Sequence, residues 1–173
     1  LPQIRGAAEQ KLNESNTRMI LDRMFIDILG YKIDEVKAEQ AIQGRRADYI
    51  FSIAGDDVMV VEVKKAGMVL REKQVFQATS YGAYAGIRWA LLTNLTQWNV
   101  YHISREDKVE GNLVFSVDLS KDITHQDADL LILISRYGLG RKILLEKLWS
   151  ETNALSENSI VSAILTDDVI SKI

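Results

Sequence analysis

Residues 46–64 read Arg-Ala-Asp-Tyr-Ile-Phe-Ser-Ile-Ala-Gly-Asp-Asp-Val-Met-Val-Val-Glu-Val-Lys, and this stretch decides the fold class. Residues 46–53 and 57–64 have the composition of β-strands, and Ala-Gly-Asp between them is typical of a turn, so the stretch predicts a hairpin. From Val58 to Val63 the second strand is apolar on both faces, apart from Glu62. Strands of that kind lie in sheets covered on both sides. The sequence therefore predicts a central sheet between layers of helices.

A carboxylate and an ammonium group emerge together at the end of this strand. Because side chains alternate between the two faces of a strand, Val58, Val60, Glu62 and Lys64 share one face. Both charged groups are costly to bury without a partner. Taken alone, these two residues indicate a buried Glu62–Lys64 ion pair or a strand end that reaches water.

The hairpin register adds a second carboxylate at the same place. If the turn uses three residues, Ala54 to Asp56, then Asp48 lies directly opposite Glu62. Two like charges opposed across a strand pair are destabilising unless something compensates them. A divalent cation is the natural compensation, so this register predicts a metal site. A loop of two or four residues would instead place Asp48 opposite Val63.

The rest of the chain predicts a single domain over residues 1–173, with a core of about 10–118 and a C-terminal helical extension of about 124–173. Its only proline is Pro2, and no linker or repeat interrupts it. Gly138 and Gly140 fit a turn between the last two helices. Apolar spacing predicts helices at 10–29, 70–85, 126–137 and 142–150, and strands at 88–94, 97–103 and 113–117. Strands bracketed by helices give an α/β (α+β) fold.

Composition excludes several classes of function. The chain has no cysteine, which excludes thiolate nucleophiles and iron–sulfur ligands and suits a cytoplasmic location. A net charge of −3 argues against a dedicated nucleic-acid binder but permits an enzyme that touches DNA locally. No apolar run is long enough to cross a membrane, and no signal peptide is visible. His102 and His125 lack zinc-ligand spacing, and no Walker-type phosphate loop is present, so the chain is not itself an ATP-driven motor.

The order of motifs resembles the N-terminal nuclease domain of the restriction subunit of type I restriction enzymes, a branch of the PD-(D/E)XK nuclease superfamily. The resemblance runs from about residue 13 to 102 and rests on these stretches: Ala47-Asp48, Glu62-Val63-Lys64, Lys65-Ala66-Gly67, Gln77-Ala-Thr-Ser-Tyr81, Gly86 to Asn94 and Trp98 to Tyr101. Ala47 replaces the proline of the superfamily motif and leaves the ligand Asp48 intact. The resemblance implies a restriction-endonuclease-like αβββαβ core, a mixed central sheet flanked by helices, and extra C-terminal helices.

The resemblance also implies a Mg²⁺-dependent endonuclease, with Mn²⁺ as a substitute. The metal ligands that the resemblance implies are the carboxylates of Asp48 and Glu62 and the backbone carbonyl of Val63. These hard oxygens suit Mg²⁺. The other catalytic residues implied are Lys64, which orients a water or neutralises charge, Gln77 and Tyr81, which hold the lysine or a phosphate, and Glu14, an acid near the metal. Read alone, Gln77 and Tyr81 are an ordinary polar pair on one helix side, and Glu14 is a first-turn acid that favours the helix dipole.

Several basic residues flank the proposed site and predict phosphate contacts. They are Arg45, Arg46, Lys65, Arg71 and Lys73, although each alone also fits a solvated charged rim. The partners implied are DNA, and the motor (helicase) domains and specificity or methylation subunits of a type I restriction complex. The alternative is a non-catalytic module that retains the nuclease fold and binds nucleic acid or a protein. The sequence leaves open whether the target is DNA or RNA, and whether the chain is a fragment or a stand-alone protein.

Overall fold

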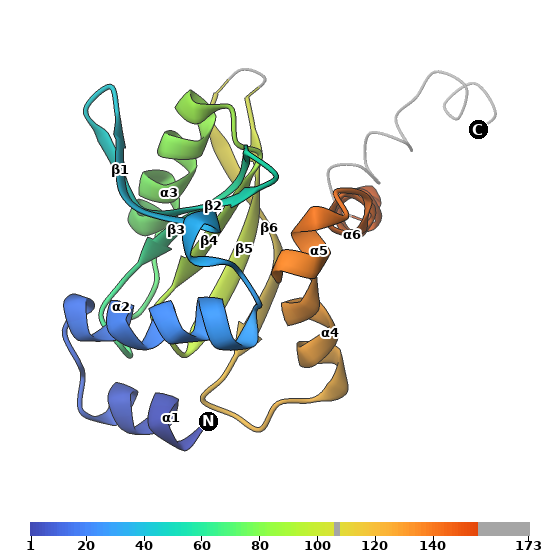
Figure 1. Ribbon diagram of the computed structural model, residues 1–173. Coiled ribbons are helices and arrows are strands. Elements are labelled where there is room, and N and C mark those ends of the chain that lie inside the picture. Colours follow the sequence, from blue (N-terminus) through green and yellow to red (C-terminus); the bar gives the residue numbers. More distant parts are fainter. Residues whose placement is uncertain (106–107, 156–173) are drawn as a thin grey trace, which may run out of the picture.

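Six strands form one mixed sheet in the computed structural model, which describes residues 1–105 and 108–155 (Figure 1). The strands are β1 (Val36–Ile42), β2 (Arg45–Ile53), β3 (Asp56–Val63), β4 (Trp89–Thr93), β5 (Gln97–Ser104) and β6 (Glu110–Asp118). They lie side by side in sequence order, and every neighbouring pair is antiparallel except β3 and β4, which are parallel. The parallel pair requires a crossover, and α3 (Glu72–Ala85) supplies it.

Helices cover both faces of this sheet. The remaining helical elements are α1 (Pro2–Glu9), α2 (Glu14–Arg23), the π-helical turn η1 (Met24–Ile28), the 3-10 turn η2 (Ile33–Glu35), α4 (His125–Leu133), α5 (Arg136–Gly140) and α6 (Ile143–Ala154). Figure 1 shows α3 on one side of the sheet, and α2 with the C-terminal helices on the other. The order α2-β1-β2-β3-α3-β4 is the αβββαβ core, so the predicted fold class is confirmed.

The turn between β2 and β3 differs from the prediction, but the predicted register survives. Ile53 pairs with Asp56, so the loop has two residues, Ala54 and Gly55, and the expected three-residue loop is wrong. Both loop residues have positive φ, as a tight hairpin turn requires. A β-bulge between Phe51 and Ser52 then adds one residue to β3 and shifts the pairing by one.

Beyond the bulge, the pairs follow the register that the three-residue loop would have given, because Ile50 pairs with Val60 and Tyr49 with Val61. The bulge also moves Val58, which packs in the core on the α2 side of the sheet, whereas Val60 packs under α3. The prediction that these two valines share a face is therefore wrong, because the extra residue interrupts the strict alternation of the strand.

Helix α2 is shorter than the predicted 10–29 helix and is followed by a π turn. Asn13 caps α2, with its side chain accepting a hydrogen bond of 2.9 Å from the backbone of Asn16. In η1, the backbone N–H of Leu29 donates to the carbonyl of Met24, five residues earlier, which inserts one residue into the helical repeat. The apolar stripe therefore moves on to Leu29, which is buried, while Ile28 is 70% exposed.

The C-terminal helices also differ from their predicted bounds. The predicted 126–137 helix stops near Ile134, and Gly138 and Gly140 lie in the short helix α5 rather than in a turn. Trp149 of α6 stacks on His102 of β5 at 4.5 Å between ring centroids, which ties the extension to the sheet. The part of the predicted extension after residue 155 lies outside the described residues. Among the described residues, no helix combines the length and apolarity that a membrane span needs.

Candidate active site

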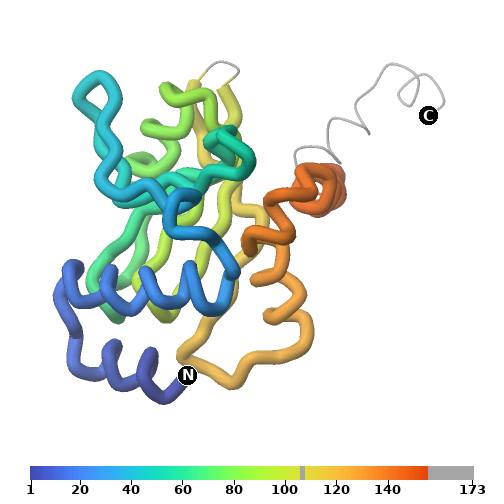
Figure 2. Tube along the Cα trace, viewed as in Figure 1, coloured from blue at the N-terminus to red at the C-terminus, as the bar shows by residue number. Residues whose placement is uncertain are grey.

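A cavity of about 270 Å³ lies at the end of β3, between the N-terminus of α2, the first three strands and α3. Its lining residues are Glu14, Arg18, Glu39, Arg46, Ala47, Asp48, Glu62, Lys64 and Gln77. The tube in Figure 2 shows the β1–β2 hairpin projecting from the body beside α3. Charged side chains from α2, β1, β2 and the end of β3 converge in this cavity, which is unusual for a partly buried position.

Asp48 and Glu62 enter the cavity from neighbouring strands. Extending the Tyr49–Val61 pairing by one residue sets Asp48 opposite Glu62. Oδ2 of Asp48 accepts a hydrogen bond of 2.7 Å from the backbone N–H of Val63. This bond fixes the carboxylate against β3 and leaves Oδ1 as its unbonded oxygen among the described side-chain hydrogen bonds.

Glu62 forms the ion pair with Lys64 that the two residues alone predict. Nζ of Lys64 lies 2.6 Å from Oε1 of Glu62. Burial opposes the charge of Lys64, but the Glu62, Glu14 and Asp48 carboxylates together outweigh burial, so the pKa of Lys64 is raised. Asp48 adds a second carboxylate beside this pair, and the cation next to it is Arg18, whose Nη1 lies 4.0 Å from Oδ1 of Asp48.

Burial and the neighbouring carboxylates together shift the pKa of Glu62. Burial raises it most, the nearby Asp48 carboxylate raises it further, and Lys64 offsets only part of the effect, so the pKa of Glu62 is about 7. The residue is 2% exposed. A buried carboxylate that resists ionisation beside a second carboxylate is the situation that a bound cation relieves.

A divalent metal ion fits this donor set. Asp48 and Glu62 offer carboxylate oxygens, which Mg²⁺ and Mn²⁺ prefer. In a strand, the N–H and C=O of one residue point to the same neighbour, so the carbonyl of Val63 lies on the β2 side, as its N–H does. The described residues contain no group of three or more His, Asp or Glu side chains placed to hold one ion. Glu14 lines the same cavity, and its carboxylate contributes to the raised pKa of Glu62.

The N-terminus of α2 is fastened directly to the segment that follows β3. Thr17 is fully buried, and its hydroxyl accepts a hydrogen bond of 3.0 Å from the backbone N–H of Ala66 while donating to the carbonyl of Asn13 at 2.8 Å. These bonds hold Glu14 and Arg18, which lie one turn apart on α2, beside the end of β3.

The two predicted residues of α3 lie in different places. Gln77 lines the cavity. Tyr81 is buried under α3 with Ile50 and Val60 and is absent from the cavity lining. Burial raises the pKa of its hydroxyl, with a further contribution from Asp57, which lies at the opposite end of β3 from Glu62. The structure thus brings Gln77 to the cavity but not Tyr81.

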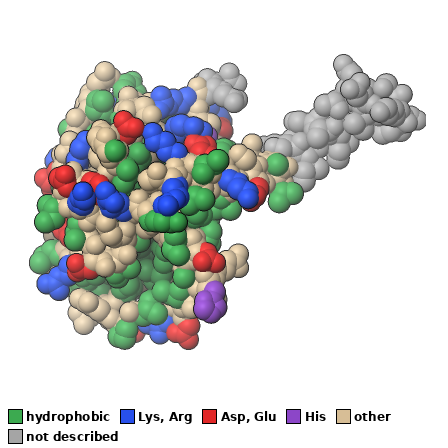
Figure 3. Space-filling model, turned by 45° about the vertical axis from the view of Figure 1, so that its right-hand side comes forward, with side chains coloured by type: hydrophobic (Ala, Val, Ile, Leu, Met, Phe, Trp, Pro, Cys, Tyr) green, Lys and Arg blue, Asp and Glu red, His purple; other side chains and the backbone are tan. Residues whose placement is uncertain are grey.

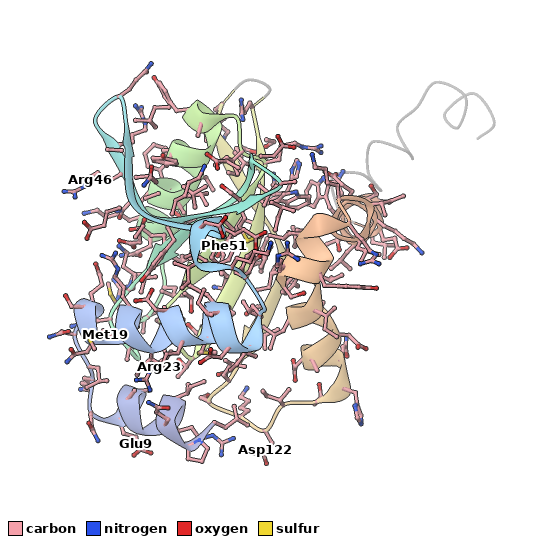
Figure 4. All side chains as sticks on the ribbon, in the orientation of Figure 1. Glu9, Met19, Arg23, Arg46, Phe51 and Asp122 are labelled. Atoms are coloured by element: carbon pink, nitrogen blue, oxygen red, sulfur yellow. The ribbon has the colours of Figure 1, made fainter. Side chains whose placement is uncertain are left out.

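Only one of the predicted phosphate-contacting residues lines the cavity. Arg46 is exposed there, and Figure 4 shows it pointing outward beside the β1–β2 hairpin. Arg45 instead stacks on the ring of Tyr84, at 3.7 Å from the ring centroid. Arg71 lines a separate groove between α3 and β6. Lys65 and Lys73 are exposed outside the lining of the cavity.

Sequence reasoning missed two residues of the cavity, Arg18 and Glu39. Arg18 follows Glu14 by four residues, a spacing that places both on one helix face, so the sequence held a signal for it. Glu39 lies on β1, which the sequence did not predict as a strand. Its contribution could not be found without the pairing of β1 with β2.

The family described as type I restriction enzyme R protein N terminus (HSDR_N) matches residues 13–116. The chain belongs to this family. The matched HSDR_N region begins at the cap of α2 and ends in β6, so it contains every residue of the cavity.

No curated protein matches the chain. A similar solved structure is that of the type IIG restriction endonuclease BpuSI, with 17% sequence identity and a TM-score of 0.37. The similarity covers 87% of this chain and 16% of the BpuSI chain, so the chain spans a small part of that protein's length.

Proposed function

We propose that the chain is a metal-dependent endonuclease domain that hydrolyses DNA phosphodiester bonds, either as part of a type I restriction R protein or as a homologue of its N terminus. The opposition of Asp48 and Glu62 in a cavity that also holds Lys64 supports the proposal most strongly. A module that only binds has no need of two opposed carboxylates, which cost stability without a cation. Membership of the HSDR_N family supports the same conclusion.

In this proposal Asp48, Glu62 and the carbonyl of Val63 would hold one Mg²⁺ ion, or Mn²⁺ as a substitute. Such an ion, when bound, would supply positive charge beside the scissile phosphate and make a water molecule easier to deprotonate. Lys64 has an ammonium group 2.6 Å from Glu62, where it can orient the attacking water and stabilise negative charge that develops on the phosphate. Gln77 offers an amide from α3 to Lys64 or to a phosphate oxygen, and Arg46 offers a positive charge at the rim.

Weak binding of DNA by the chain alone is part of the proposal. The net charge is −3, and on the face drawn in Figure 3 basic side chains are interspersed with acidic ones rather than gathered in one patch. Non-specific affinity comes almost entirely from Lys and Arg contacts to phosphates. Delivery of DNA by motor domains and by specificity or methylation subunits in the cytoplasm would supply what this chain lacks.

Cleavage of linear duplex DNA tests the function. We expect little cutting at physiological salt with Mg²⁺, cutting at low salt or with Mn²⁺, and none by Glu62→Gln, while Glu9→Gln on α1 removes a distant exposed charge and serves as the control. Robust cutting by the wild type at physiological salt would contradict the need for delivery. Binding without cutting under every metal and salt condition would favour the non-catalytic module, and a parallel RNA substrate decides between the two nucleic acids.

A further inference from the structure

Three acidic residues form a row across the first three strands. Pairing of Ala38 with Tyr49 and of Gln40 with Ala47 places Glu39 of β1 opposite Asp48, and the β2–β3 register places Glu62 on the other side of Asp48. All three acids line the same cavity. Lys64 neutralises one end of this row, and the other end needs a cation of its own.

Arg18 provides that cation. Its Nη1 donates a hydrogen bond of 3.1 Å to Oε1 of Glu39 and lies 4.0 Å from Oδ1 of Asp48. Its Nε donates to the hydroxyl of Tyr49 at 3.2 Å, and the guanidinium lies 5.0 Å from the centre of the Tyr49 ring. Tyr49 and the helix thus fix the guanidinium beside the Asp48 oxygen that the Val63 N–H leaves unbonded.

The two carboxylates beside Arg18 differ in freedom. The Asp48 side chain is 18% exposed and is held by the backbone of β3. The Glu39 side chain is 62% exposed, and Glu39 has a φ of 51°, a left-handed conformation within the edge strand β1. Glu39 can therefore leave the guanidinium by turning into water, whereas Asp48 stays in place.

Charge in the cavity decides what Arg18 can bind. Four carboxylates and three cations line it, which leaves one net negative charge when all are ionised. A DNA phosphate would be repelled by that charge. A divalent ion would make the net charge of the cavity positive. Departure of Glu39 would remove one negative charge and raise that net charge by one more unit.

We propose that Arg18 is a phosphate-binding residue of the candidate active site and that Glu39 occupies its guanidinium in the absence of DNA. A backbone phosphate and the Glu39 carboxylate then compete for the same hydrogen-bond donors, as both present oxygens of similar geometry to arginine. This inference rests on the proposed function, since it takes DNA as the ligand. It assigns Glu39 the role of an internal competitor that weakens binding until DNA is delivered.

Binding of a fluorescent duplex by anisotropy, with Ca²⁺ in place of Mg²⁺ and over a series of salt concentrations, tests the competition. Glu39→Gln should tighten binding by about threefold, the effect of one exposed ion pair. Arg18→Gln should weaken binding by about tenfold and reduce the salt slope by about one, as loss of a phosphate contact does. Arg18→Lys keeps the positive charge and should keep most of the slope.

The double variant Arg18→Gln/Glu39→Gln distinguishes competition from a general charge effect. The gain from Glu39→Gln should vanish without Arg18, because nothing remains for Glu39 to occupy. Matched controls are Glu9→Gln and Arg23→Gln, which remove exposed charges, and Figure 4 shows both residues near α1 and away from Arg46. Glu9→Gln should not tighten binding as Glu39→Gln does, and Arg23→Gln should not weaken binding as Arg18→Gln does.

A gain from Glu39→Gln that persists in the double variant would overturn the inference, as would an unchanged salt slope in Arg18→Gln. If circular dichroism shows that Arg18→Gln does not fold, Glu39→Gln and Arg18→Lys still test the inference. No gain in affinity for Glu39→Gln, or a lost salt slope for Arg18→Lys, would contradict the inference. A wild type that binds no duplex at low salt would overturn this inference as well. Intact, coupled binding without cleavage would contradict the proposed function alone.

Discussion

Replacing Glu62 with Gln should stabilise the protein above neutral pH while it abolishes cleavage. The carboxyl group has a pKa of about 7 in the folded chain and 4.5 in the reference state, so the folded chain binds its proton more tightly than the unfolded chain does. The contribution of Glu62 to the free energy of unfolding is therefore fully present below about pH 4.5 and is lost as the pH rises through 7. Gln keeps the size of the side chain and cannot ionise.

The size of the effect follows from the same pKa. Each pKa unit corresponds to about 1.4 kcal/mol, so the rise from 4.5 to about 7 gives a cost of about 3 kcal/mol at about pH 8. The attraction of Lys64 is already included in that pKa, because Lys64 partly offsets burial and Asp48. At about pH 5 most of the cost is absent, since Glu62 is then protonated in the folded chain.

Urea unfolding of the wild type and Glu62→Gln at the two pH values measures this difference. We expect the variant to be more stable at about pH 8 and close to the wild type at about pH 5. Mn²⁺ should raise the stability of the wild type more than that of the variant, because a ligand stabilises the state that binds it. A difference that is independent of pH, or a variant less stable at about pH 8, would refute the assignment of Glu62 as a strained carboxylate.

Three further results are expected. Lys64→Ala should abolish cleavage and keep Mn²⁺ affinity in calorimetry, whereas Asp48→Ala should lose both; equal loss of affinity would show that the lysine is misassigned. Gln77→Ala should reduce cleavage more than Tyr81→Phe, because only Gln77 lines the cavity, and the reverse order would place the tyrosine hydroxyl at the substrate. Burial and the nearby Arg88 lower the pKa of His102 from 6.5 to about 4, so stability should fall as the pH drops across that range. Between about pH 6.5 and pH 4, the melting temperature of His102→Phe should fall less than that of the wild type. The same fall in both proteins would refute this assignment.

The sequence predicted the fold through its strongest local signals. The apolar run of β3, the helix stop at Gly86 and the spacing of α3 each depend on residues close together in the chain. The opposition of Asp48 and Glu62 was also predicted, although from a wrong loop length. The bulge that restores the register depends on packing of both sheet faces, which no local pattern reveals.

Features set by distant contacts escaped prediction. β1 is an edge strand without a clean alternation of apolar and polar residues, and Glu39 breaks its regularity with a positive φ. The π turn in η1 changes which of Ile28 and Leu29 is buried, an outcome decided by tertiary packing. The helix spacing of Glu14 and Arg18 was available from the sequence, but the partner that gives Arg18 its meaning lies on β1.

Anomalous diffraction from crystals soaked in Mn²⁺ tests the central claim most directly. One Mn²⁺ peak should lie within coordination distance of both Asp48 and Glu62, at roughly 2.0–2.4 Å from a carboxylate oxygen of each. The peak should be absent from crystals of Asp48→Ala. Mn²⁺ bound elsewhere, or two carboxylates that remain occupied only by Lys64 and Arg18 at saturating Mn²⁺, would contradict the proposal that this cavity is a metal-dependent nuclease site.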